Sequence, residues 1–295
     1  MKPKVSIIIL NWNGLKDTAE CLDSLKKIAY PNYEVIVVDN ASVENEAGAL
    51  EKKYGNYIRV VRNKENLGFA GGNNIGINLV LKEGASKYVL LLNNDTTVES
   101  DFLDEMVRAG EEGEKIGMVG GKIYYYRDPE KIWYGGGKIV LSALRAPHEI
   151  AEFRKTKSVS FITGCLMLIK TAVFKEVGLL SEDYFLTVED WDFSYCVGKI
   201  FTMKVTPFAV IYHKVSAATG GERSSMQAYY CRRNRWIFMK KFVKNPFARI
   251  IAVFFYFLSF VKVMVLPIIG GRITVDWTAI AATRAAIEGE TGKRK

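Results

Sequence analysis

Three acidic residues, Glu189, Asp190 and Asp192, lie close together in the sequence VEDWDF. A positioned carboxylate can take the proton from an attacking hydroxyl while negative charge builds on the leaving oxygens on the opposite side. Neighbouring acids can raise the pKa of such a carboxylate, so the three form a plausible general-base cluster. The structural alternative is an acidic helix start, because Asp and Glu favour the first turn of a helix.

A second polar group ends an apolar run, where Asn93, Asn94 and Asp95 follow Leu90–Leu92. Residues two apart on a strand end point the same way, so the side chains of Asn93 and Asp95 would converge. Carboxylate and amide oxygens suit a hard divalent cation that holds a diphosphate. Taken alone, Asn-Asn-Asp is also a common turn sequence.

The elements that position these residues form an alternating pattern of strands and helices. Short β-branched or apolar runs predict strands at 5–10, 34–38, 57–61 and 88–92, and apolar residues at helical spacing predict a helix over 17–27. In such βαβ architecture, ligands bind outside the carboxyl ends of the strands. Each polar residue at a strand end could be only a turn former or helix cap, but several together favour a polar ligand cleft. These residues are Asn11, Asp39, Asn40, Asn63 and Asn93 to Asp95.

The segment 65–76, ENLGFAGGNNIG, places four glycines between a predicted strand and an apolar-periodic helix. Glycine lets backbone amides and a helix N-terminus approach a phosphate closely, and we expect that role here. The segment lacks the G-x-G-x-x-G pattern of dinucleotide sites and the G-K-[ST] of a P-loop.

The composition is that of a folded globular protein. The chain has 295 residues, of which 49% are hydrophobic and 25% charged, with 25 Gly and 7 Pro, which excludes disorder and fibrous repeats. The four scattered cysteines (Cys21, Cys165, Cys196 and Cys231) indicate neither a zinc site nor a disulfide framework, and we expect reduced thiols in the cytoplasm. The apolar run at 5–10 is too short for a secretory signal.

The net charge of +9 is concentrated after residue 213. From Lys214 onward there are 15 Lys and Arg against 4 Asp and Glu, or +11, which leaves −2 for the first 213 residues. The basic part also contains the apolar stretch 250–271, interrupted by Lys262. Basic residues beside an apolar segment favour an anionic membrane surface over nucleic acid as the partner. A buried helix of a soluble bundle is the alternative.

Together, these motifs resemble family 2 glycosyltransferases, most closely the rhamnosyltransferase-like branch. The similarity covers about residues 3–235 and rests on VSIIILNWNG, VVDNAS, ENLGFAGGNNIG, LLLNNDT, the strand-like FITGCLMLIK at 161–170, FLTVEDWDF and IYH at 211–213. It implies an α/β fold of the GT-A type, a Rossmann-like nucleotide-diphospho-sugar transferase with a mixed, mainly parallel sheet flanked by helices. It also implies an inverting mechanism assisted by Mg²⁺ or Mn²⁺.

The resemblance assigns roles to particular residues. Asp190 would be the base, beside Glu189, and Asp95 the main metal ligand, with Asn93 in place of the first acid of Asp-x-Asp. His213, at the end of a predicted strand 204–212, would complete the metal site, although a lone His there is usually structural. The donor nucleotide would contact Asn11, Asn13, Asp39, Asn66, Gly68, Asn93 and Asn94.

Four further residues are predicted to contact the acceptor or a phosphate, namely Gly164, Asp192, Arg233 and Asn234. Arg233 and Asn234 belong to the aromatic and basic run 229–241, which could neutralise phosphates of the donor or of a lipid-linked acceptor. A solvated basic helix face is the alternative. Residues 219–221, Thr-Gly-Gly, are predicted to form a mobile connector before this run.

The sequence therefore predicts an enzyme in two parts. Residues 1–215 would form the GT-A domain, with a nucleotide-binding half (1–98) and an acceptor half (99–215), and residues 216–295 a basic, apolar helical region on the cytoplasmic face of a membrane. The enzyme would transfer a hexose, in the rhamnosyltransferase-like case rhamnose, from a nucleotide-diphospho-sugar to a glycan or lipid-linked acceptor. The alternatives are a nucleotidyltransferase on a similar fold and a catalytically silent, membrane-bound carbohydrate-binding protein.

Overall fold

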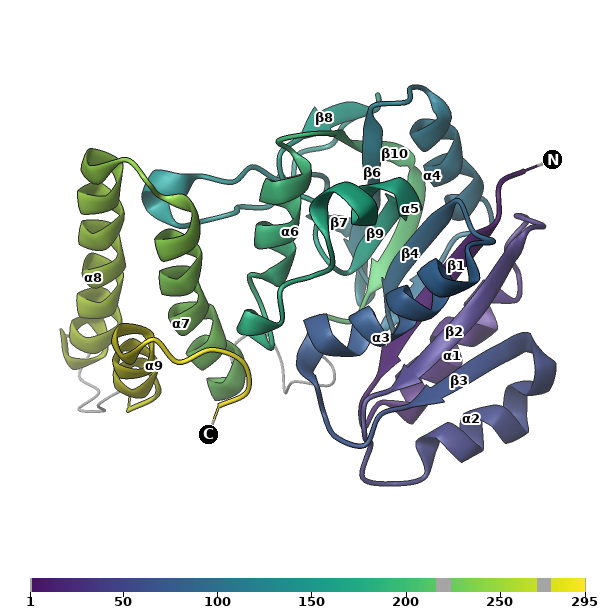
Figure 1. Ribbon diagram of the computed structural model, residues 1–295, viewed down its shortest axis with the longest axis horizontal. Coiled ribbons are helices and arrows are strands. Elements are labelled where there is room, and N and C mark those ends of the chain that lie inside the picture. The colour runs from purple at the N-terminus through teal and green to yellow at the C-terminus, as the bar shows by residue number, and fades with distance from the viewer. Residues whose placement is uncertain (1, 216–223, 270–276, 295) are drawn as a thin grey trace.

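The computed structural model describes residues 2–215, 224–269 and 277–294, with side chains omitted for 265–269. A mixed sheet with flanking helices forms one part of the molecule, and α7, α8 and α9 stand beside it as a separate helical layer (Figure 1). The strands are β1 (Val5–Asn11), β2 (Tyr33–Asp39), β3 (Ile58–Arg62), β4 (Tyr88–Asn93), β5 (Thr96–Val98), β6 (Ile116–Tyr125), β7 (Asp128–Tyr134), β8 (Lys157–Val159), β9 (Leu166–Lys170) and β10 (Thr202–His213). The helices are α1 (Leu15–Leu25), α2 (Glu46–Tyr54), α3 (Gly68–Glu83), α4 (Phe102–Glu111), α5 (Thr171–Val177), α6 (Glu189–Val197), α7 (Ser225–Phe242), α8 (Pro246–Ile269) and α9 (Trp277–Glu288), with short 3₁₀ turns η1 (Gly55–Tyr57), η2 (Leu141–Ala143) and η3 (Glu182–Tyr184).

The strand order is β3-β2-β1-β4-β9-β6-β10-β5, with β7 added to β6 and β8 added to β10. Strands β3, β2, β1 and β4 run parallel, whereas β9 is antiparallel to both β4 and β6. The first four predicted strands and the 17–27 helix are confirmed, each shifted by at most two residues. β1 reads as a continuous apolar run because it is buried on both faces, with Ile7, Ile8 and Ile9 fully covered.

The glycines of 65–76 differ from expectation. Only Gly68 stands at the start of α3, whereas Gly71, Gly72 and Gly76 lie inside the helix. A Cβ at Gly72 would meet the Leu10 side chain at 2.4 Å, and one at Gly76 would meet Ile8 at 2.9 Å. Two of these glycines therefore let α3 pack closely on β1, and the expected approach to a phosphate is restricted to the N-terminal end.

Two other predicted elements change their limits. The strand expected over 161–170 begins only at Leu166, because Gly164 and its neighbours form a turn before β9. The strand expected over 204–212 is β10, which runs from Thr202 to His213 and thereby ends on the histidine itself.

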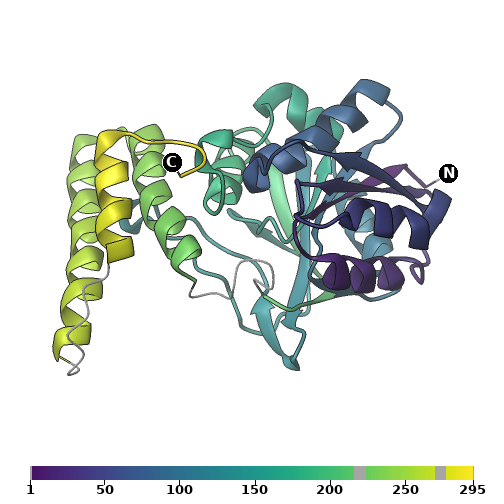
Figure 2. The ribbon, with the colours of Figure 1, turned by 90° about the horizontal axis from the view of Figure 1, so that it is seen from below.

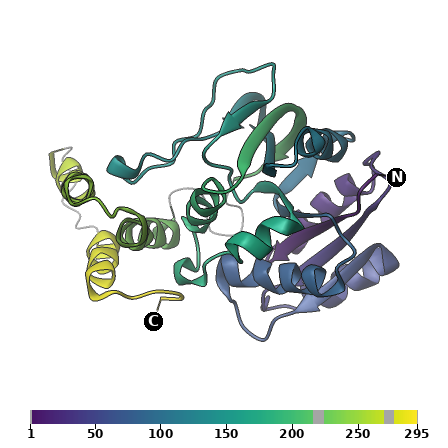
Figure 3. The ribbon, with the colours of Figure 1, turned by 45° about the horizontal axis from the view of Figure 1, so that its top comes forward.

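The helices after β10 form a layer beside the sheet, seen from below in Figure 2. The segment that contains η2 reaches out from the sheet toward this layer and contacts α8 (Figure 3). A second hydrophobic cluster joins the layer to the sheet part, with Leu144, Tyr184 and Val188 packed against Phe238 of α7 and Tyr256 of α8. The predicted connector 219–221 lies outside the described residues.

Candidate active site

The carboxyl ends of β1 and β2 carry the first polar network. Paired register places Asn11 opposite Asp39, and Asn11 Nδ2 donates to Asp39 Oδ1 at 2.9 Å. Ser42 Oγ donates to the same oxygen at 2.6 Å, and Asn11 also donates to Glu46 Oε2 at 2.9 Å. Asn13 joins the network through its backbone amide, which donates to Ser42 Oγ at 3.0 Å. Three predicted donor-binding residues are thus held together.

Asn40 fixes the loop that begins α3. Its Nδ2 donates to Asn66 Oδ1 at 2.9 Å and to the carbonyl of Gly68 at 3.1 Å, and its Oδ1 accepts from Leu67 N. Gly68 has φ +73°, and a Cβ there would lie 2.2 Å from the Phe185 carbonyl oxygen. Glycine is required at this position on both counts, since the left-handed backbone disfavours other residues and there is no room for a side chain.

Asp95 and His213 meet because β5 runs antiparallel to the end of β10. His213 pairs with Thr96, the residue after Asp95, and the Lys214 amide donates to the Asp95 carbonyl at 2.9 Å. His213 Nε2 lies 3.1 Å from Asp95 Oδ1, and both side chains are buried. That approach lacks hydrogen-bond geometry, and both ring nitrogens of His213 have no hydrogen-bond partner among the described residues.

This pair fits a divalent cation. A buried imidazole nitrogen left unsatisfied beside a carboxylate is costly unless a ligand completes it. Two ligand atoms at about 2.1 Å from one octahedral cation lie about 3 Å apart, which agrees with the observed approach. Among the described residues, no group of three or more His, Cys, Asp or Glu could hold a metal, so Asp95 and His213 are two candidate ligands and no more.

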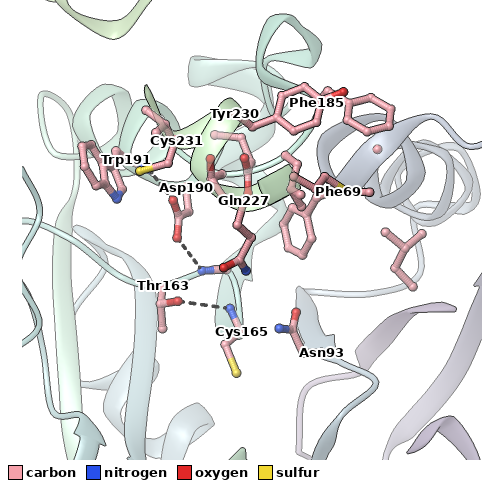
Figure 4. A pocket seen from close by; sticks show the side chains of 18 of the residues that line it. Phe69, Asn93, Thr163, Cys165, Phe185, Asp190, Trp191, Gln227, Tyr230 and Cys231 are labelled. Atoms are coloured by element: carbon pink, nitrogen blue, oxygen red, sulfur yellow. Dashed lines mark hydrogen bonds between the residues drawn. The ribbon is translucent and has the colours of Figure 1, made fainter. Parts of the chain in front are cut away.

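Glu189 and Asp190 open α6, so the helix start that we considered as an alternative coexists with the acidic pair. Asp190 Oδ2 accepts from the Gly164 amide at 3.1 Å, shown dashed in Figure 4, and Oδ1 accepts from the Trp191 amide at 3.0 Å. Burial raises the pKa of Asp190 to about 6, while these amides act in the opposite sense. Burial, and then the charge of Asp190, raises the pKa of Glu189 well above its usual range.

Asp192, Arg233 and Asn234 contact other parts of the protein. Asp192 Oδ2 accepts from Tyr184 Oη and from Lys241 Nζ, both at 2.7 Å, which ties α6 to α7. Arg233 and Asn234 are fully buried and donate to backbone carbonyls of the loop before α6. None of the three lines the pocket described next, and Arg233 and Asn234 do not lie on a solvated basic face either.

One pocket of about 760 Å³ gathers most of the predicted residues. In Figure 4, Asp190 and Trp191 lie on one side, Asn93 and Cys165 across from them, and Phe69 beside Phe185 on a third. The predicted residues that line it are Asn66, Gly68, Asn93, Asn94, Asp95, Gly164, Glu189, Asp190 and His213. Asn11, Asn13 and Asp39 lie outside it, but Thr18 Oγ1 links Asn94 to Asn11 through hydrogen bonds of 2.9 and 2.6 Å.

The pocket also includes residues that the sequence did not suggest. Trp133 packs edge to face on His213, with ring centroids 4.5 Å apart, and on His148 at 4.6 Å. Lys293 and Arg294 also line the pocket, and they are the Lys and Arg residues in the lining that the structure describes. Trp133 lies on β7, which the sequence patterns did not reveal, and the tail residues come from a segment far along the chain.

The mixed α/β sheet flanked by helices, with this pocket at its strand ends, has the fold of GT-A glycosyltransferases. The solved mannosyltransferase PcManGT of Pyrobaculum calidifontis, in complex with GDP-Man and Mn²⁺, has the same fold, with a TM-score of 0.61 at 18% identity over 99% of this chain and 77% of its own. The model of glycosyl transferase family 2 matches residues 6–178, more than half of the chain. The protein belongs to this family, as the sequence resemblance predicted.

The chain is also similar to two curated relatives, one of which is named as a hexosyltransferase. The uncharacterized protein y4gI of Sinorhizobium fredii is 30% identical over 83% of this chain and 28% of its own length. The low-salt glycan biosynthesis hexosyltransferase Agl10 of Haloferax volcanii is 25% identical over 66% of this chain and 62% of its own. The chain therefore spans less than two thirds of the length of each of these relatives.

Proposed function

We propose that this protein transfers a hexose from a nucleotide-diphospho-sugar to a hydroxyl of a glycan or lipid-linked acceptor, with inversion at the anomeric carbon. The observation that carries the proposal is the shared pocket, in which Asp190 lies across from Asn93 and which Asn94 and Asp95 also line. One wall supplies a proton acceptor, and the other supplies groups suited to a diphosphate. Mannose in the complex of the structural relative and the hexosyltransferase name of Agl10 support a hexose, and the rhamnosyltransferase-like branch stays part of the proposal.

Asp95 and His213 would hold the divalent cation, Mg²⁺ or Mn²⁺. A bound cation would neutralise charge on the departing diphosphate, as Mn²⁺ accompanies GDP-Man in the complex of the structural relative. With two protein ligands, positions remain for phosphate oxygens of the donor. Asn93 and Asn94 are neutral, so the protein charge near the cation comes from Asp95.

The transfer itself needs one proton movement. The acceptor hydroxyl oxygen attacks the anomeric carbon, its proton passes to Asp190, and the bond to the diphosphate oxygen breaks on the opposite face of the sugar. Asp190 must be ionised at the start. Its two backbone hydrogen bonds orient the carboxylate, since the Gly164 and Trp191 amides each fix one oxygen.

Donor binding would involve the networks at the ends of β1, β2 and β3. Asn66 and Gly68 line the pocket, while Asp39, with Asn11 and Asn13, would contact the base or ribose just beyond it. Gly164 would contact the acceptor side, because its amide donates to Asp190, the proposed base.

Membrane attachment is a further part of the proposal. One helical stretch among the described residues, Pro246–Met264, is long and apolar enough to cross a membrane. Only 11% of its most apolar part is buried inside the protein. We propose that residues 1–215 form the catalytic domain, with halves at 1–98 and 99–215, and that 216–295 bring it to the cytoplasmic membrane face. A lipid-linked acceptor would be found there.

Donor turnover tests the activity. The purified chain is incubated with a panel of nucleotide-diphospho-sugars, Mn²⁺ or Mg²⁺ and candidate acceptors, and the released nucleotide is identified. Release of nucleoside diphosphate, together with a product whose glycosidic bond has the opposite anomeric configuration to that of the donor, supports the proposal. Release of pyrophosphate would instead indicate a nucleotidyltransferase, and no turnover with any donor would favour a carbohydrate-binding protein.

A further inference from the structure

The loop that leads into α6 has a strained backbone. Phe185, Thr187 and Val188 have φ values of 60°, 65° and 74°. Positive φ is uncommon for residues other than glycine and is a real outlier for β-branched side chains such as Thr and Val. Each such residue is energetically unfavourable and persists only where the surroundings hold it.

Asn234 of α7 supplies much of what holds this loop. Its Nδ2 lies 2.7 Å from the carbonyl oxygen of Tyr184, 2.8 Å from that of Leu186 and 2.9 Å from that of Thr187. One amide group therefore donates to three successive parts of the loop, sharing its two protons among three acceptors. The three bonds together tie Asn234 to the observed conformation of the loop.

Arg233 sets the orientation of that amide. Arg233 Nε donates to Asn234 Oδ1 at 3.0 Å, so the oxygen faces the guanidinium and the NH₂ group faces the loop. Arg233 Nη2 donates to the Tyr184 carbonyl at 3.2 Å as well. Burying a guanidinium with no exposed surface is costly, and these hydrogen bonds offset part of that cost.

The loop connects both sides of the pocket. The Phe185 carbonyl accepts from the Phe69 amide at 2.7 Å and presses against Gly68 at the start of α3. At its other end, Val188 is the N-cap residue of α6 and precedes Glu189 and Asp190 directly. The side chain of Tyr230 stacks on Phe185 with ring centroids 5.1 Å apart, and both are seen side by side in Figure 4.

We propose that Arg233 and Asn234 are positioning residues, which clamp the strained loop 184–188 so that Asp190 faces the reacting groups. This inference rests on the proposed function, since it takes Asp190 as the base. The role proposed here for Arg233 and Asn234 differs from the phosphate contact that the sequence suggested. The donor wall has its own support in the Asn40 bonds to Asn66 and Gly68, so the clamp acts chiefly on the base.

The test compares Asn234→Ala with the control Asn245→Ala. Asn245 caps α8 through a 3.0 Å bond from the Ala248 amide and has no bond to the loop, so its loss lowers stability without touching the clamp. Calorimetry with nucleoside diphosphate and Mn²⁺ gives the Kd and the fraction of binding-competent sites, and turnover is then expressed per competent site. We expect Asn234→Ala to lower kcat per site by about 10²-fold, the size of a misplacement of about 1 Å, with Kd changed less than threefold.

A second variant covers the case in which Asn234→Ala folds poorly. Thr187→Gly removes the strain at φ 65° and a buried hydroxyl without a partner among the described residues, so in the Asn234→Ala background it should raise the thermal midpoint. It should leave kcat per site low, because a relaxed loop still lacks its clamp. Recovery of both the thermal midpoint and kcat in the double variant would show a merely structural role and overturn the inference.

Failure of the inference is separable from failure of the proposed function. If Asp190→Asn loses turnover while Asn234→Ala matches Asn245→Ala per competent site, the clamp is wrong and the base stands. If Asp190→Asn keeps wild-type turnover, the assignment of the base is wrong, and the inference fails with it.

Discussion

The backbone amide of Gly164 donates a 3.1 Å hydrogen bond to Asp190 Oδ2. Gly164 belongs to the turn before β9, and Asp190 to the first turn of α6, so the bond joins two elements that meet only in the folded protein. A Cβ at Gly164 would lie 2.9 Å from the Phe69 ring. The same glycine thus orients the carboxylate and leaves room for the aromatic side chain of the donor wall.

Replacement of the base gives the first prediction. Asp190→Asn should lower kcat by about 10² to 10⁴, the usual contribution of a general base, because the amide cannot take the hydroxyl proton. Donor binding should persist, since the role proposed for Asp190 is proton transfer and not contact with the donor. Steady-state kinetics measure the fall in kcat, and calorimetry measures donor binding. Glu189→Gln is the control and should cost less; a dead Glu189→Gln with an active Asp190→Asn would transfer the role to Glu189.

The pH profile gives the second prediction. Burial raises the pKa of Asp190 to about 6, so the base loses its charge as the pH falls through that value. We expect kcat/KM to decline on the acid side with a midpoint near pH 6. For the same reason, the buried carboxyl lowers folding stability as the pH rises from its ordinary pKa of 3.8, and that loss is complete above about pH 6.

Turnover measured from about pH 3.5 to about pH 8.5 checks this profile. Glu189→Gln should leave the midpoint near its wild-type position, because burial rather than Glu189 is the main cause of the shift in the Asp190 pKa. An acid limb centred near pH 4 in the wild type would contradict the prediction.

Gly68 and Gly84 form a matched pair for the third prediction. Both have left-handed backbone, with φ +73° and +67°, but a Cβ at Gly84 meets nothing within 4 Å, whereas one at Gly68 meets the Phe185 carbonyl oxygen at 2.2 Å. Gly84→Ala should therefore lower the free energy of unfolding by about 1 kcal/mol through strain alone. Gly68→Ala adds the steric clash and should cost at least about 1 to 3 kcal/mol more. Denaturant unfolding of both variants measures the difference, and equal losses would show that the loop yields freely.

Much of the fold was predictable because parallel strands that are buried on both faces appear in the sequence as short, continuous apolar runs. The runs that form β1, β2, β3 and β4 are short, apolar and followed by polar residues, which indicated parallel strands and the edge where Asn11, Asp39 and Asn93 gather. The GT-A fold followed from the same motifs. The glycines inside α3 were misread because a pattern of glycines does not reveal whether they face a ligand or a neighbouring strand.

The strand pairings in the later part of the chain could not be predicted from the sequence. β9 inserts antiparallel between β4 and β6, and β5 closes on the end of β10, so that His213 meets Asp95 through a strand pairing that local sequence does not encode. The clamp formed by Arg233 and Asn234 was likewise hidden, since a basic and aromatic run looks the same whether it is buried or solvated. Which buried groups meet is decided by tertiary packing.

Loss of the cation ligand gives the fourth prediction. Asp95→Ala should abolish the part of nucleoside diphosphate affinity that depends on Mn²⁺, because His213 alone holds a divalent cation weakly. Calorimetry with and without Mn²⁺ measures this part. Asp101→Ala, an exposed acid at the start of α4 without a side-chain cap bond, is the control and should bind as the wild type does. Unchanged Mn²⁺-dependent affinity in Asp95→Ala would show that Asp95 is not a metal ligand.

The membrane prediction concerns the exposed apolar side of α8. Phe247, Ile250 and Phe254 are 80%, 68% and 61% exposed, whereas Ala252 and Tyr256 on the other side are buried. Water-exposed aromatic and aliphatic side chains at helical spacing are typical of an interfacial helix. The net charge of +11 after residue 213 adds attraction to an anionic surface, about 1 kcal/mol for each basic residue near it.

The packing of α8 favours a helix in the membrane plane over one that crosses it. The Arg232 guanidinium of α7 lies 5.5 Å from the Tyr256 ring and 5.3 Å from the Phe260 ring, and Arg232 Nη2 donates to Ser259 Oγ. A crossing helix would carry this cation into the hydrocarbon layer or lose these contacts, and both are costly. An in-plane helix keeps α7 on the aqueous side and leaves Lys262, which is exposed, free to reach the headgroups.

The full chain should therefore float with anionic liposomes, and the triple variant Phe247→Ser, Ile250→Ser, Phe254→Ser should stay in solution while keeping donor turnover, because these side chains lie outside the pocket. The matched control replaces exposed apolar residues elsewhere, Val43→Ser with Ile150→Ser, and should float as the wild type does. Raising the salt concentration should weaken binding of the wild type, since the basic residues contribute through screened charge. Flotation of the triple variant equal to that of the wild type would show that another surface makes the contact. If the wild type itself fails to float, no membrane attachment of this kind exists, and the apolar side of α8 must be covered by protein.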